Sequence, residues 1–133
     1  MARLTVAADL SGVDRVRFFL KNALNRLDPS EEEFFKVELA VVEMCVNIAR
    51  YAYPGAAGKI TIAISVEGRK ATIEISDSGV PFDPRSAPKP DMGWILATGR
   101  TGGLGIYLAR SLMDRFDYRR EDGRNVLTLI KCL

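Results

Sequence analysis

The sequence predicts an α+β domain, a two-layer sandwich in which helices cover one face of a single β-sheet. Residues 33–54 repeat apolar side chains at helical spacing almost all the way round, which indicates a long buried helix. Residues 60–76 alternate apolar and polar side chains in two runs, as expected for a hairpin of half-buried strands. Helices interrupt the strands without strict alternation. We therefore expect a mixed sheet of five strands, covered on one face by three helices.

Chain length and composition narrow the possible classes of protein. The 133 residues fit one domain spanning 1–133, and a net charge of +2 is too balanced for a nucleic-acid-binding surface. There is no histidine, which excludes histidine as a metal ligand, a general base or a phosphoryl acceptor. No apolar run has the length of a membrane span, and the two cysteines have no metal-site spacing. We expect a soluble, cytoplasmic protein with reduced thiols and no membrane contact.

The first elements are a strand and a surface helix. Residues 3–8 alternate enough to form a strand, after which Asp9 or Ser11 can cap a helix that runs to about Leu27. Asp28 and the proline after it end this helix. Its core-facing residues recur every three or four positions: Val13, Val16, Leu20, Leu24 and Leu27.

The long helix carries two oxygen-bearing side chains on its one polar stripe. Ser30 and Glu33 form a capping box at its start. Glu43 and Asn47 are four residues apart, so they point the same way and can share one small target. A carboxylate can accept a proton, and an amide oxygen can bind Mg²⁺ alongside phosphate oxygens. Alone, such a stripe is usually a solvated face, but the motifs that follow favour a functional site.

The predicted hairpin turns at Gly68 and delivers a carboxylate, Asp77, to the end of its second strand. Gly79 follows closely and allows the backbone to approach another group. Residues 85–101 then form a loop long enough to be a functional lid, with Trp94 near its middle.

A glycine cluster precedes the last helix. Residues 99–105 contain four glycines and lead into a helix over 106–114, where free backbone amides can attract phosphate. The cluster lacks the Lys-Ser/Thr ending of a P-loop, so by itself it is weak evidence. Two strands, 116–120 and 126–133, complete the chain around a turn at 121–124.

Three motifs, in this order, resemble the GHKL ATPase superfamily: residues 43–47 on a helix, 77–79 after a strand and 102–105 before a helix. Within it the chain looks most like the bacterial anti-sigma-factor serine kinases, because residues 50–54, 81–84 and 122–125 also match that branch. The resemblance covers nearly the whole chain. It implies the Bergerat ATP-binding fold, with ATP and Mg²⁺ as cofactors.

The resemblance also implies roles for individual residues. Asn47 would hold the Mg²⁺ that bridges the ATP phosphates, and Glu43 would be the general base. Asp77 would accept a hydrogen bond from the adenine amino group, and Gly79 would let the backbone approach the base. The phosphates would lie against the glycine segment, where the implied residues are Arg100, Gly102, Gly103, Leu104 and Gly105.

The chain departs from the superfamily pattern at two places. Pro81 stands where many members have a second glycine, which stiffens the turn after Asp77. Many members place a threonine ahead of the last strand to help hold adenine, but Arg124 and Asn125 stand there instead. Adenine contacts beyond Asp77 are therefore open.

The leading functional prediction is an ATP-dependent serine-protein kinase and anti-sigma factor. It would bind a sigma factor and phosphorylate a small anti-sigma-factor antagonist on serine, and the resemblance implies a homodimer. The alternative is an ATP-gated module that sequesters a sigma factor with little or no kinase activity. A histidine-kinase ATPase domain would need its phosphoacceptor histidine on another chain, and gyrase-like use would need a further domain.

Overall fold

The computed structural model describes residues 1–86, 91–98 and 104–133. The strands are β1 (Ala2–Ala7), β2 (Lys59–Glu67), β3 (Lys70–Asp77), β4 (Arg115–Glu121) and β5 (Arg124–Cys132). The α-helices are α1 (Leu10–Leu24), α2 (Glu31–Tyr51), α3 (Met92–Thr98) and α4 (Leu104–Leu112), and short 3₁₀ turns cover Asn25–Leu27 and Pro84–Ser86.

The sheet is antiparallel throughout, in the order β1-β2-β3-β5-β4, so the prediction of a mixed sheet is wrong. A helical connection from β3 to β4 would ordinarily place two parallel strands side by side. These two strands do run in the same direction, but β5 folds back between them and pairs antiparallel with both. The tight turn that permits this has Asp122 and Gly123 at positive φ, 51° and 73°.

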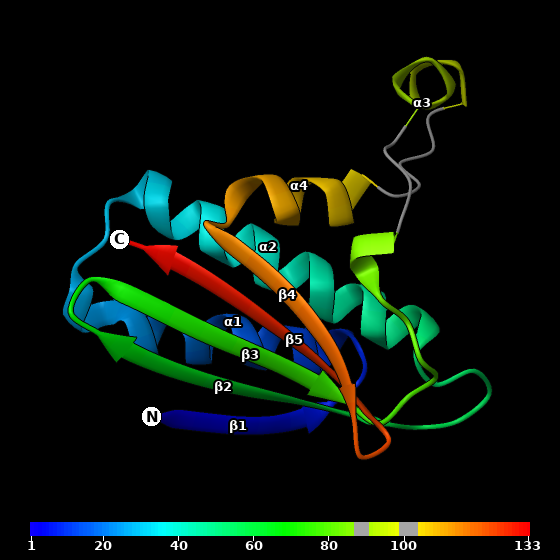
Figure 1. Cartoon of the computed structure of the whole chain (residues 1–133), viewed down its shortest axis with the longest axis horizontal. Coiled ribbons are helices and arrows are strands. Elements are labelled where there is room, and N and C mark those ends of the chain that lie inside the picture. Colours follow the sequence, from blue (N-terminus) through cyan, green and yellow to red (C-terminus); the bar gives the residue numbers. More distant parts are fainter. Residues whose placement is uncertain (87–90, 99–103) are drawn as a thin grey trace.

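Helices α1, α2 and α4 lie on one face of the sheet, as predicted, and α3 lies apart from them (Figure 1). The core between the layers consists of apolar side chains that are almost fully buried, including Val16, Leu20, Val37, Val41, Ile62, Ile73 and Leu129. No helix in the described segments is long and apolar enough to cross a membrane.

The predicted N-caps of the first two helices are confirmed. The Asp9 carboxylate accepts a hydrogen bond from the Gly12 amide at 2.8 Å, and the Ser30 hydroxyl accepts one from the Glu33 amide at 3.1 Å. The first helix ends earlier than expected, at Leu24, and continues as a 3₁₀ turn before Asp28 takes a left-handed conformation. The last turn is tightened because the chain must reverse into α2.

Helix α2 is less uniformly buried than its sequence suggests. Phe35 is 59% exposed, although the sequence pattern predicts apolar burial almost all the way round this helix. Ala40, three residues before Glu43 on the predicted polar stripe, is fully buried, and α4 packs along α2. Burial also raises the pKa of the Cys45 thiol to about 12, so this cysteine is an inert packing residue.

A methyl group at Gly12 is expected to destabilise the whole fold. A Cβ there would overlap the Ala7 carbonyl oxygen, because α1 begins directly against the end of β1. Backbone cannot move aside as a flexible side chain can, so Gly12→Ala should lower the free energy of unfolding by about 1–3 kcal/mol. Chemical denaturation measures this, with Gly93→Ala as a control at a glycine of ordinary helical backbone, where a Cβ would meet only the end of the Asp91 side chain. Equal effects at both sites would contradict the packing explanation.

Candidate active site

A cavity of about 190 Å³ opens between the C-terminal half of α2, the end of β3, the start of β5 and the loop after Asp77. Its wall is mainly apolar and includes Met44, Ile48, Ile75, Val80, Phe82 and Leu127. Sites for drug-sized ligands measure roughly 300–1,000 Å³, so this cavity suits one ring system of a larger molecule. Two polar side chains of the sequence prediction, Asn47 and Asp77, line it together.

Asp77 is buried, with 6% of its surface exposed, at the last position of β3. Its Oδ1 atom accepts hydrogen bonds from the Gly79 amide and from the Asn125 side chain, both at 2.9 Å. Within the described part of the chain both bonds use this one oxygen, which leaves Oδ2 as an acceptor for a ligand. A carboxylate oxygen in an apolar cavity selects a ligand that donates a hydrogen bond.

The loop after Asp77 is fastened to the C-terminal end of α2. The Val80 amide donates to the Ala52 carbonyl at 2.9 Å, and a Cβ at Gly79 would overlap the same carbonyl group. The Tyr53 hydroxyl accepts from the Ser78 amide at 2.9 Å and donates to the Lys59 carbonyl at 2.6 Å. Gly79 is therefore required for close packing of backbone on backbone, a reason the sequence alone does not supply.

Glu43 and Asn47 occupy neighbouring places on α2 with different surroundings. Asn47 lines the cavity, whereas Glu43 is not among the lining residues. The Glu43 carboxylate instead lies against the start of α4, where a Cβ on Gly105 would overlap its Oε2 atom. The absence of a side chain at Gly105 thus gives this carboxylate its space.

The structure describes only part of the predicted phosphate segment. Leu104 is the first residue of α4, two residues before the predicted start of this helix, and Gly105 follows it. Arg100, Gly102 and Gly103 lie outside the described residues, as does part of the predicted lid over 85–101. The roles assigned to these residues remain predictions.

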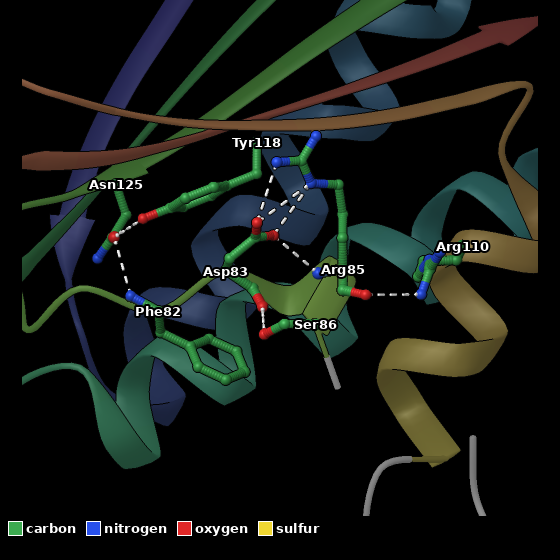
Figure 2. Close-up of polar contacts among 7 residues, drawn as sticks. All are labelled: Phe82, Asp83, Arg85, Ser86, Arg110, Tyr118 and Asn125. Carbon is green, nitrogen blue, oxygen red and sulfur yellow. Dashed lines mark hydrogen bonds and ion pairs between the residues drawn. The ribbon is translucent and has the colours of Figure 1, made fainter. Parts of the chain in front are cut away.

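Several residues of the site were not identified from the sequence (Figure 2). The Tyr118 hydroxyl donates to Asn125 Oδ1 at 2.6 Å, and the guanidinium of Arg85 lies over the Tyr118 ring at 5.9 Å from its centroid. Arg85 also pairs with Asp83 at 3.0 Å, and its hydrogen bonds hold the pKa of Asp83 below the ordinary value. The advance signals were the resemblance of residues 81–84 and 122–125 to the anti-sigma branch and the position of Asn125, where a superfamily threonine was expected.

Comparison with known proteins agrees with this architecture. The family model described as "Histidine kinase-like ATPase domain" matches residues 6–131. The serine-protein kinase RsbW of Bacillus cereus is 27% identical over 128 residues, which cover 93% of this chain and 80% of that protein. RsbW of Bacillus anthracis is 28% identical over the same shares.

Two solved structures share the fold at low sequence identity. One is a chain of the SiaB–SiaC complex from Pseudomonas aeruginosa, with a TM-score of 0.59 and 18% identity, covering 100% of this chain and 90% of that one. The other is the Acinetobacter baumannii histidine kinase AdeS, with a TM-score of 0.51 and 12% identity over 99% and 68%. The family model matches residues 6–131, which include every residue that lines the cavity. The chain therefore belongs to the histidine kinase-like ATPase domain family.

Proposed function

We propose that this chain is an ATP-dependent serine-protein kinase that phosphorylates a small anti-sigma-factor antagonist and binds a sigma factor. One observation carries the proposal. An apolar cavity holds Asp77 and Asn47 together, and the Glu43 carboxylate lies one helical turn from Asn47, against the start of α4. This arrangement offers a base-binding end and a metal ligand in one cavity, with a proton acceptor one helical turn away.

The base-binding end suits adenine rather than guanine. Asp77 Oδ2 can accept a hydrogen bond from an exocyclic amino group, while the apolar wall covers the ring faces. Guanine carries a carbonyl oxygen at the position of that amino group, and an oxygen facing a carboxylate would be repelled. The cavity itself is too small for a whole nucleotide, so the ribose and phosphates would lie outside it, and we place them towards the start of α4, where Gly105 meets Glu43.

The phosphate end supplies the groups that phosphoryl transfer needs. The Asn47 amide oxygen fits Mg²⁺, which when bound neutralises charge on the phosphates. Glu43 would accept the proton of the attacking serine hydroxyl. The serine oxygen would bond to the γ-phosphorus while the bond from that phosphorus to ADP breaks and ADP departs. The carboxylate keeps this position because Gly105 leaves room for it, and the first amides of α4 face the same region.

The relatives support the choice of reaction. RsbW proteins are named serine-protein kinases and align with this chain over 93% of its length. The serine specificity and the two protein partners are proposed on that basis.

A transfer assay tests the proposal. The chain should transfer radiolabelled γ-phosphate from Mg·ATP to a candidate antagonist protein, and the label should be acid-stable, as expected of phosphoserine and not of phosphohistidine. The matched control is an antagonist whose acceptor serine is changed to alanine, which should stay unlabelled. If the chain binds ATP and a sigma factor but labels no antagonist, the kinase is ruled out and the sequestering module replaces it.

A further inference from the structure

The Asn125 side chain makes four hydrogen bonds to the protein. Its Nδ2 donates to Asp77 Oδ1 and to the Val80 carbonyl, both at 2.9 Å. Its Oδ1 accepts from the Phe82 amide at 3.2 Å and from the Tyr118 hydroxyl at 2.6 Å, and Figure 2 shows both of these contacts. A primary amide has two N–H donors and two acceptor lone pairs, so every position is used.

The partners fix the orientation of this amide. A carboxylate and a backbone carbonyl can only accept, so the NH₂ group must face Asp77 and Val80. A backbone N–H can only donate, so the amide oxygen must face Phe82. Asn125 is 7% exposed and stands opposite Asp77 in the β3–β5 register. A saturated, buried amide has nothing left to offer a nucleotide directly.

We propose that Asn125 is the positioning residue of the nucleotide cavity and sets its preference for adenine through Asp77. The inference rests on the proposed function of the cavity as an adenine site. By occupying Asp77 Oδ1, Asn125 leaves Oδ2 as the remaining acceptor of a carboxylate that lines the cavity. By holding Val80 and Phe82, it also fixes the cavity wall before any ligand arrives.

According to the proposal, Asn125 affects nucleotide affinity through the contacts to the adenine ring and not through those to the phosphates. A variant at this position should therefore weaken ATP and ADP by the same factor. A variant that merely lowered the folded fraction would also weaken both nucleotides equally, so thermal unfolding without nucleotide must show that the variant is folded at each pH used. Asn125→Asp is the sharpest change, because it keeps the shape and replaces the NH₂ donor with a second carboxylate beside Asp77.

The new carboxylate creates a pH signature. Two carboxylates in hydrogen-bond contact share one proton, since the pKa of one of them is raised by the like charge. The introduced carboxyl group, once protonated, could donate to Asp77 Oδ1 as the Asn125 amide does, so binding should recover as the pH falls. The other titratable or charged groups around this position are Tyr51, Asp83, Arg85, Tyr118, Arg120 and Arg124. Asp83 is the carboxyl group among them, and its hydrogen bonds with Arg85 hold its pKa below the ordinary value, so it stays ionised from pH 8 to pH 5.5.

The experiment is calorimetry of ADP and ATP binding to wild type and Asn125→Asp from pH 8 to pH 5.5. At pH 8 we expect both nucleotides to bind about 10–100-fold more weakly to the variant, the usual worth of losing a hydrogen bond to a charged group. The difference should shrink at least about tenfold by pH 5.5. Taking the ratio to wild type at each pH cancels the titration of the nucleotide. Asn22→Asp, the same change at an exposed site on α1, should match wild type throughout.

Asn125→Thr provides a second variant if the aspartate destabilises the fold at high pH. Its hydroxyl can still donate to Asp77 but cannot hold the loop, so its loss should be smaller and independent of pH. A loss at Asn125→Asp that is unchanged by pH, or that differs between ATP and ADP, overturns the inference alone. Failure of the wild type to bind either nucleotide overturns the proposed function and this inference together.

Discussion

Replacing Glu43 with glutamine is expected to slow phosphoryl transfer by roughly 10²–10⁴-fold, the usual contribution of a positioned general base. Glutamine keeps the shape that packs against Gly105, so the start of α4 should not move. It cannot accept the serine proton at neutral pH. Nucleotide affinity and the complex with the partner protein should therefore barely change.

The matched variant is Asn47→Ala, one turn along the same helix. Asn47 lines the nucleotide cavity and is the proposed metal ligand, so its loss should weaken Mg·ATP binding itself as well as the rate. Single-turnover labelling of the antagonist, run beside calorimetry with and without Mg²⁺, separates the two phenotypes. A Glu43 variant that transfers phosphate at the wild-type rate, or an Asn47 variant whose binding still responds fully to Mg²⁺, would contradict the assigned roles.

Changing Asp77 to asparagine is expected to lower ATP and ADP affinity by about 10–100-fold, because the amide group would present a donor where the base also donates. The fold should survive. Asparagine retains an oxygen that can accept from the Gly79 amide and from Asn125, which are the two contacts that Asp77 Oδ1 makes. The expected result is a folded protein with an empty base-binding end.

Calorimetry with ATP, ADP and GTP measures this effect, and thermal unfolding without nucleotide provides the control for stability. Wild type should discriminate strongly against GTP, and the variant should lose most of that discrimination. Equal wild-type affinity for GTP and ATP, or unchanged ATP affinity in Asp77→Asn, would refute the adenine assignment. Because the proposed position of Asp77 Oδ2 depends on Asn125, the effects of changing Asp77 and Asn125 on nucleotide affinity should not be additive.

Much of the fold could be predicted because its signals are local. Asp9 and Ser30 each cap the helix that follows, and a capping bond joins residues only three apart. The large buried residues of α1 were predicted, since the spacing of Val13, Val16, Leu20 and Leu24 records which side of the helix is buried. The β2–β3 hairpin was equally plain, because alternation and a turn glycine lie within one short stretch.

The family and its motif residues also came from the sequence. Glu43, Asn47 and Asp77 lie in short motifs that can be recognised without knowing the fold, and the family match confirms the superfamily. That Asn47 and Asp77 share one cavity is a statement about two residues far apart in the sequence, and it needed the packing of α2 on the sheet.

Tertiary structure alone decided the strand order and the support of the site. No local signal states that β5 inserts between β3 and β4, because strand pairing depends on which backbone edges remain free once the helical connection is made. That insertion places Asn125 opposite Asp77, 48 residues away in sequence, and so creates the hydrogen bond between them. The packing of α4 on α2 likewise brings Gly105 to Glu43. The sequence by itself determined most of the elements and the candidate site residues, since these depend on near neighbours. Only long-range packing decided the strand order and how those candidate residues are held.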